Sequence, residues 1–340
     1  VIENDGKNTK LANALTIVHP ETASAQDIVN AIKAAGMVGL GGAGFPTFIK
    51  YNNAKGIESV LINGVECEPY LTTDYFTMQN DGEYLIRGAE LLQKASGAKE
   101  IVIAYKVHKY AVREALTKLI ADKPHIRLVE VPDAYPMGWE KLLISQVFKR
   151  SYEKLPSEAG VAVNNAQTAI AVGRALLLGE VLTHRLVTVS GDAVKTPGNI
   201  LVPIGTPVDQ IIAFADGYTQ EEVSLLPGGP MTSKAALNDT FAVTPTLGGL
   251  TVIKPYVSQE VACLRCGACT AHCPAFLQPI EIKLALEAKD NERMEKLNTM
   301  KCVECGLCSY VCPSKIEVAD AVKRAKVMVR FNQAKNAPKK

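Results

Sequence analysis

Two cysteine-rich segments near the C-terminal end, residues 263–273 and 302–312, constrain this chain more than any other feature. Each has the spacing Cys-x-x-Cys-x-x-Cys-x-x-x-Cys-Pro, in which three thiols can wrap one corner of a cubane cluster while the fourth points away. Zinc sites draw on two separated pairs of ligands instead, so zinc is the weaker alternative. The spacing therefore predicts two [4Fe–4S] clusters. Because the fourth cysteine ligates the other cluster in two-cluster ferredoxins, the predicted sets are Cys263, Cys266, Cys269 and Cys312 for one cluster, and Cys302, Cys305, Cys308 and Cys273 for the other.

The rest of the composition excludes several classes of protein. Clustered thiols, with Cys67 the one cysteine outside the two segments, indicate metal in a reducing compartment rather than a disulfide framework. A net charge of +2 is too small to indicate a nucleic-acid partner. The most apolar stretch, residues 168–178, is broken by Arg174, and no apolar run reaches the ~18–20 residues that span a bilayer. We expect any membrane association to come through partner proteins.

The first half of the chain alternates short apolar runs with helical stretches. A helix is expected over residues 20–36, with Ser24 as its N-cap, Asp27 three residues later and Gly36 at its end. The alternation that follows is typical of an α/β layer with a largely parallel sheet. The predicted strands are Val60–Ile62, Ile101–Ala104, Leu128–Val131 and Val161–Val163, and the predicted helices cover residues 83–95, 109–121, 139–149 and 167–178.

The composition changes after Leu182. Short strands at 186–189, 200–202 and 250–253, with one helix at 208–214 and Pro/Gly turns between them, predict a small α+β domain. Between the cysteine segments, the apolar spacing of residues 280–300 favours a helical hairpin, and so a helical ferredoxin domain. The predicted domains are 1–182, 183–254 and 255–330, followed by a basic tail over 331–340. The chain starts without methionine, and residues 1–6 read as a strand leading into a turn, so we expect a fragment of a longer protein.

A glycine-rich loop, Gly39-Leu40-Gly41-Gly42-Ala43-Gly44, matches the dinucleotide pattern G-x-G-x-x-G by letter. That pattern acts through a strand before it and a helix after it, whereas here a helix precedes and Phe45-Pro46 follows. A Rossmann loop is therefore disfavoured. Two interpretations remain: a tight turn in which the glycines serve packing alone, or a loop whose backbone N–H groups approach a phosphate or a flat ring.

Residues 39–50, which end in Lys50, resemble the flavin loop of the NADH-oxidising, FMN-bearing subunit of respiratory complex I. The similarity is closer to the C subunit of the Rnf electron-transport complex, because further motifs and both cysteine segments follow in the same order. These motifs are Asn63-Gly64-Val65-Glu66-Cys67-Glu68-Pro69-Tyr70, Tyr135-Pro136-Met137-Gly138-Trp139-Glu140-Lys141, Val163-Asn164-Asn165-Ala166-Gln167-Thr168 and, at the start of a soluble-ligand-binding β-grasp (SLBB) domain, Val187-Thr188-Val189-Ser190-Gly191-Asp192 through Pro197-Gly198-Asn199.

The resemblance implies a site for FMN and NAD(H). The glycine-rich loop would pack on FMN, Lys50 would reach its phosphate or polar edge, and Phe45 would flank the nicotinamide unless it is a core aromatic. The asparagines would bond the flavin unless they only form turns, and Glu140 would contact NADH. Glu66 and Glu68 alternate along an extended segment and so share one side of the backbone, where they would serve a ligand or cation, or form a solvated face. The implied cofactor-binding residues are Gly39, Gly41, Gly42, Gly44, Phe45, Lys50, Asn63, Glu66, Glu68, Tyr135, Glu140, Asn164 and Asn165. No catalytic side chain is expected, because the cofactors carry the chemistry.

The resemblance also implies a function. Such a chain is the peripheral subunit of an ion-translocating NAD:ferredoxin oxidoreductase, which exchanges hydride between NADH and FMN and relays single electrons through the clusters. Its partners would be other subunits of the complex at the cytoplasmic face of the cell membrane, with NADH and ferredoxin as redox partners. Two departures are Val65 and Trp139, which replace acidic residues of the complex I protein, and the family's N-terminal β-rich domain is missing. Two alternatives stay open: a cobalamin-reductase flavoprotein of bacterial microcompartments, and a non-catalytic iron–sulfur relay with an empty flavin pocket.

Overall fold

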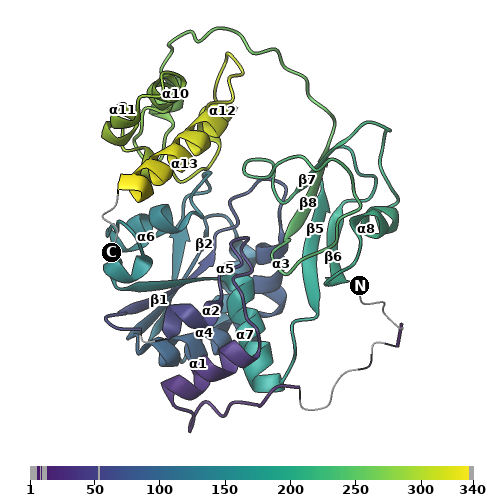
Figure 1. Cartoon of the computed structure of the whole chain (residues 1–340). Coiled ribbons are helices and arrows are strands. Elements are labelled where there is room, and N and C mark those ends of the chain that lie inside the picture. The colour runs from purple at the N-terminus through teal and green to yellow at the C-terminus, as the bar shows by residue number, and fades with distance from the viewer. Residues whose placement is uncertain (1–5, 8, 10–13, 53, 337–340) are drawn as a thin grey trace.

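The computed structural model describes residues 6, 7, 9, 14–52 and 54–336, which form three parts (Figure 1). The strand predicted for residues 1–6 falls outside the described residues, apart from Gly6. The first part is an α/β domain, the second a small domain with a mixed sheet, and the third is helical. The elements of the first part are α1 (Ala25–Ala34), α2 (Thr47–Tyr51), β1 (Ser59–Gly64), α3 (Thr73–Asn80), α4 (Gly82–Ser96), β2 (Glu100–Lys106), α5 (Tyr110–Leu119), β3 (Ile126–Val131), α6 (Glu140–Phe148), η1 (Pro156–Ala159), β4 (Val161–Asn165) and α7 (Ala166–Leu178).

The α/β domain is built on a four-stranded sheet in the order β3-β2-β1-β4, with every neighbouring pair parallel. Successive side chains of these buried strands face opposite layers. Ile62 and Ile103 pack in a core with residues of α1, α4, α5 and α7, whereas Leu61 and Val102 pack in a second core with Leu143 of α6. The predicted α/β layer with a parallel sheet is confirmed.

Local signals set the helix ends and their spacing. The Ser24 hydroxyl accepts the Asp27 N–H at 3.2 Å and the Asp27 carboxylate accepts the Ser24 N–H at 2.9 Å, which is the predicted capping box at the start of α1. Helices α4 and α7 approach closely because they meet at glycines: a Cβ on Gly88 would lie 1.9 Å from the carbonyl oxygen of Ala169. Only glycine permits that contact.

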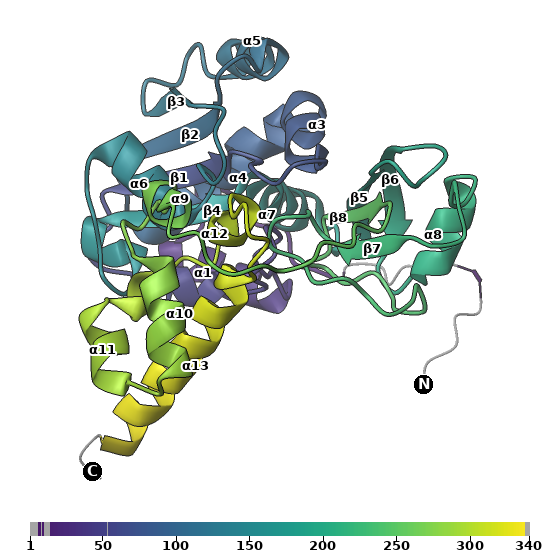
Figure 2. The same cartoon turned by 90° about the horizontal axis from the view of Figure 1, so that it is seen from above.

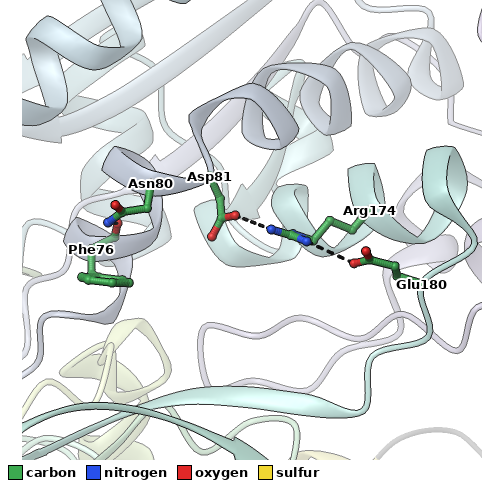
Figure 3. Close-up of polar contacts among 5 residues, drawn as sticks. All are labelled: Phe76, Asn80, Asp81, Arg174 and Glu180. Atoms are coloured by element: carbon green, nitrogen blue, oxygen red, sulfur yellow. Dashed lines mark hydrogen bonds and ion pairs between the residues drawn. The ribbon is translucent and has the colours of Figure 1, made fainter.

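Arg174 interrupts the apolar run of α7 without disturbing its packing, because its side chain lies at the surface. The guanidinium pairs with Asp81 at the start of α4 and, at 3.1 Å, with Glu180 after α7 (Figure 3). It also lies over the Tyr84 ring, 4.5 Å from its centroid. These surface pairs connect the ends of the two helices.

The second part contains β5 (His184–Ser190), β6 (Gly198–Pro203), α8 (Val208–Phe214), β7 (Ser224–Pro227) and β8 (Gly249–Ile253). Its sheet has the order β6-β5-β8-β7, with a parallel central pair and antiparallel outer pairs. Val208 and Ile211 of α8 pack on Val187 and Val189 of the central strand β5. A mixed sheet covered by one helix is the predicted β-grasp arrangement.

The third part contains α9 (Ala268–Ala271), α10 (Pro279–Glu287), α11 (Asn291–Lys296), η2 (Thr299–Lys301), α12 (Leu307–Tyr310) and α13 (Val318–Asn336). The predicted hairpin is present as α10 and α11, whose Ile282 and Met294 pack on Val322 of α13. Seen from above, α10, α11 and α13 lie on one side of the molecule and β5–β8 on the other, with α12 between them (Figure 2). Within the segment predicted as a basic tail, 331–340, residues 331–336 are helical and continue α13.

Several elements were absent from the sequence prediction, among them α3, α2 and β7. Helix α3 has the polar sequence TDYFTMQN, without an apolar period, and α2 and β7 are short. Long-range contacts, described below for α3, supply what the local pattern lacks. No helix in the described part of the chain is long and apolar enough to cross a membrane.

Candidate functional site

The strand order of the α/β domain reverses at β1, since β2 and β3 extend to one side and β4 to the other. Open parallel sheets bind ligands at the carboxyl ends of the strands beside such a switch point. Asn63 at the end of β1 and Asn165 at the end of β4 are register partners at this edge. The glycine-rich loop meets the start of α7 there, because the Leu40 N–H donates to Thr168 Oγ1 at 2.9 Å. The fold thus brings the loop and the asparagines to the edge where a ligand is expected.

The glycine-rich loop is a small hairpin between α1 and α2. The Gly39 N–H donates to the Phe45 carbonyl at 2.8 Å and the Gly44 N–H to the Gly39 carbonyl at 3.1 Å. Residues 41–43 at its tip are exposed, and within the described residues their N–H groups have no hydrogen-bond partner. Phe45, beside the tip, is 46% exposed and is therefore not a core aromatic. Free N–H donors close to the positive end of α7 suit an anionic group such as a flavin phosphate.

Lys50 of α2 supplies the cation of the site. Its Nζ donates to the Val163 carbonyl of β4 at 2.6 Å, and burial lowers the pKa of its ammonium while the nearby Glu140 carboxylate opposes that shift. Glu140 begins α6 and accepts the Tyr152 hydroxyl at 2.9 Å. The lysine is therefore held in one place by neighbours, which is what binding a phosphate or the polar edge of a ring requires.

The three predicted asparagines differ in how many of their side-chain donors and acceptors are hydrogen-bonded to other protein groups. Asn63 donates to the Gly138 carbonyl at 2.8 Å and accepts the Val65 N–H at 3.0 Å. Asn165 caps α7 and donates to Asp74 at 2.7 Å. Asn164 donates to the Tyr51 hydroxyl, but its buried Oδ1 has no partner among the described residues. Asn63 and Asn165 thus shape the edge of the site, and Asn164 keeps one acceptor free.

Glu66 lies in a buried polar network rather than on an open face. Its carboxylate accepts the N–H groups of Asp74 and Tyr75 at 3.0 and 3.3 Å, and so holds the N-terminus of α3. Burial, with the Asp74 carboxylate beside it, raises the pKa of Glu66 to about 7. Arg185, 3% exposed at the start of β5, balances these charges and donates to the Leu40 carbonyl of the glycine-rich loop at 2.7 Å.

Sequence reasoning did not identify Arg185, Asp74 or Gln167 as parts of the site. Gln167 donates to Asp74 at 2.6 Å and accepts from Arg185. These residues come from three distant stretches of sequence, and no motif spacing connects them. Gln167 lies in the Val163–Thr168 motif, and the local signal for Arg185 was its position at the change of composition after Leu182.

Glu68 and Tyr135 bond to the other two parts of the molecule. The Glu68 carboxylate accepts the Met231 N–H at 3.1 Å and the Thr232 hydroxyl. The Tyr135 hydroxyl donates to the Cys305 carbonyl at 2.6 Å. Glu66 and Glu68 therefore have separate protein partners and do not form one charged face, although they lie two residues apart.

The eight cysteines form two groups. A cavity of about 270 Å³ is lined by Cys263, Cys266, Cys269 and, from the second segment, Cys312. In the other group, burial raises the pKa of the Cys302, Cys305 and Cys308 thiols, and the neighbouring Cys273 thiol adds to the shift of each. Across the described residues, no three His, Cys, Asp or Glu side chains converge tightly enough to hold a single metal ion. Thiols that surround a space suit a multi-iron cluster better than zinc.

Comparisons with protein families agree with these three parts. Residues 32–174 match the Nuo51 FMN-binding domain, residues 186–235 the SLBB domain and residues 255–328 a 4Fe-4S dicluster domain. The predicted fold of each part is thereby confirmed, and FMN and two [4Fe–4S] clusters are the cofactors of the matched domains.

Curated relatives identify the family. The C subunit of the ion-translocating oxidoreductase complex of Rhodobacter capsulatus is 37% identical over 307 residues, which are 88% of this chain and 59% of that protein. The C subunit of the Na(+)-translocating ferredoxin:NAD(+) oxidoreductase complex of Acetobacterium woodii is 34% identical, over 88% of this chain and 69% of that protein. A cobalamin reductase of Salmonella typhimurium is 36% identical, over 75% of this chain and 59% of that protein. The chain therefore belongs to the C-subunit family of ion-translocating ferredoxin:NAD(+) oxidoreductase (Rnf) complexes.

Proposed function

We propose that this chain is the peripheral, electron-relaying subunit of an ion-translocating NAD:ferredoxin oxidoreductase complex. It exchanges hydride between NADH and FMN at the α/β domain and relays single electrons through two [4Fe–4S] clusters in the helical domain. One observation carries the proposal: a single chain combines free N–H donors and Lys50 at the switch point of a parallel sheet with two groups of four thiols.

The residues fit the proposed cofactors as follows. Bound FMN would supply the conversion between two-electron hydride exchange and one-electron transfer. The N–H groups of residues 41–43 and the Lys50 ammonium would hold its phosphate or polar edge, and Asn164 Oδ1 would accept a hydrogen bond from the ring. Phe45 would flank the nicotinamide. Asn63, Glu66, Glu68, Tyr135 and Asn165 would act indirectly, since protein groups already occupy them.

The proposal extends to partners and location. The two translocase relatives are subunits of multi-subunit complexes by name. We therefore infer that this chain docks on other subunits at the cytoplasmic face of a bacterial or archaeal cell membrane. NADH and ferredoxin would be the redox partners of the complex as a whole.

A direct test is FMN binding and NADH-dependent cluster reduction in anaerobically purified, reconstituted protein. Lys50→Met should weaken FMN binding by about 10- to 100-fold, because a charge-assisted contact to an anion is lost. Lys55→Met, at an exposed position just after α2, is the matched control and should bind like the wild type. If the two variants bind FMN equally well, Lys50 does not contact FMN. Eight irons per chain with no flavin, even after reconstitution, would favour the non-catalytic relay.

A second candidate is a cobalamin-reductase-type flavoprotein, which the 36% identity to the Salmonella protein supports. Both candidates share the NADH and flavin steps, so only the electron acceptor separates them. We expect NADH oxidation by the loaded protein to be coupled to ferredoxin through its complex. Faster turnover with a cobalamin acceptor would favour the second candidate.

A further inference from the structure

The segment between β3 and α6 touches both predicted cofactor regions. The Gly138 carbonyl accepts a hydrogen bond from the Asn63 side chain at the end of β1, at 2.8 Å. Three residues before Gly138, the Tyr135 hydroxyl donates to the Cys305 carbonyl at 2.6 Å. One short stretch of the α/β domain thus joins the edge of the flavin site to the second cysteine segment.

The same cysteine loop is held from the SLBB domain. Gly306 has φ 81°, and a Cβ there would lie 2.4 Å from the Met231 carbonyl oxygen. Met231 is in turn held by Glu68 of the α/β domain, which accepts its N–H at 3.1 Å. Tyr135 and the Glu68–Met231 pair therefore meet at the peptide between Cys305 and Gly306, just before α12. In Figure 2, α12 lies between the helices α10, α11 and α13 and the sheet β5–β8.

The first cysteine segment has no such enclosure. Every residue lining its cavity comes from the third part of the molecule, between Cys263 and Val318. Cys263 and Cys266 are exposed and the intervening Leu264 is 68% exposed, whereas Cys305 is 7% exposed. Two loops of identical spacing thus have opposite surroundings.

We propose that the second cysteine segment holds the inner cluster, fastened to the flavin domain by Tyr135 and Glu68, and that the first segment holds the outer, solvent-facing cluster. The inference rests on the proposed function for the presence of the clusters and adds their order. Tyr135 is a positioning residue. Its hydrogen bond draws electron density from the Cys305 peptide, which stabilises the more negative, reduced state of the inner cluster.

The test is an EPR-monitored redox titration of the reconstituted full chain with dithionite, without NADH. Tyr135→Phe should lower the midpoint potential of the second-segment cluster and leave the first unchanged. Tyr310→Phe is the matched control, because Tyr310 is 73% exposed and lies two residues from Cys308; it should leave both potentials unchanged. A shift confined to the first cluster, equal shifts in the two variants, or no shift in Tyr135→Phe would overturn the role of Tyr135.

A second measurement tests the order without a variant. An iron chelator added to the reduced protein should remove the outer cluster first, and alkylation should then label Cys263 and Cys266 before Cys302 and Cys305. Simultaneous or reversed loss would contradict the inference. Both measurements work on protein that fails to bind FMN or to oxidise NADH, so failure of the proposed function is seen separately.

Discussion

The predicted cluster region and the predicted flavin region differ in whether their side chains are already bonded to other protein groups. Around the first cysteine segment, Cys263, Cys266, Cys269 and Cys312 line an open cavity. At the carboxyl edge of the sheet, by contrast, Asn63, Glu66 and Asn165 are hydrogen-bonded to the chain itself. The proposed cluster ligands are side chains that short-range spacing can identify. The proposed flavin site depends instead on the backbone N–H groups of residues 41–43, whose placement relies on residues distant in sequence. The following predictions test this difference, from the largest expected effect to the smallest.

Cys312→Ser tests the ligation across the two segments. Removing this thiol should release the cluster of the first segment and halve the iron content, because a serine hydroxyl is a poor ligand for iron–sulfur clusters. Alkylation followed by mass spectrometry should then label Cys263 and Cys266 and spare Cys302 and Cys305. Cys273→Ser is the reciprocal control and should give the opposite labelling. Labelling of the second segment in Cys312→Ser would show that each segment holds its own cluster.

Arg185→Met tests whether the flavin region depends on residues outside its motifs. The variant leaves Asp74 and Glu66 without their buried cation, and breaking such an arrangement costs about 3–5 kcal/mol. The free energy of unfolding, measured in urea, should fall by that amount, and FMN binding should weaken because the Leu40 carbonyl loses its donor. Arg113→Met is the control, since Arg113 pairs with Glu130 at the surface. Equal losses of unfolding free energy and of FMN binding in the two variants would show that the buried network does not support the flavin region.

The pH dependence of stability probes the same network through Glu66. Its pKa in the folded protein, about 7, lies above the ordinary value of 4.5, so between these values the folded state binds more protons than the unfolded state. The free energy of unfolding should therefore fall as the pH rises from about 5 to about 7. Glu66→Gln should make this fall smaller by ~1–3 kcal/mol. Glu83→Gln, at an exposed ion pair on α4, should keep the wild-type slope. If Glu66→Gln left the pH dependence of the unfolding free energy unchanged, that dependence would come from other titrating groups.

Arg174→Met should have the smallest effect, because its ion pairs with Asp81 and Glu180 lie at the surface (Figure 3). Solvent screens such pairs, so a loss of about 0.5–1 kcal/mol is expected, shrinking at high salt. FMN and iron contents should not change. If Arg174→Met lost as much unfolding free energy as Arg185→Met, the large loss in Arg185→Met could not be attributed to its place in the flavin region.

Sequence reasoning recovered the features that short-range physics decides. Buried apolar runs identified the strands, Ser24 and Asp27 identified the start of α1, and cysteine spacing identified the two segments. It missed α3, whose polar sequence is held at its N-terminus by Glu66. It also assigned Glu66 and Glu68 to one face, because their partners on α3 and on the loop at Met231 are distant in sequence.

Arg185 has a consequence for how such a chain can be recombined. It is the second residue of β5, yet its guanidinium bonds Leu40 and Gln167 of the preceding domain. The boundary visible in the sequence is therefore not a place where the molecule separates. A hybrid that joins the α/β domain of one family member to the SLBB domain of another should keep an ordered glycine-rich loop only if it inherits this arginine together with Asp74 and Gln167. We therefore expect the α/β domain and the SLBB domain to be exchangeable between family members only together.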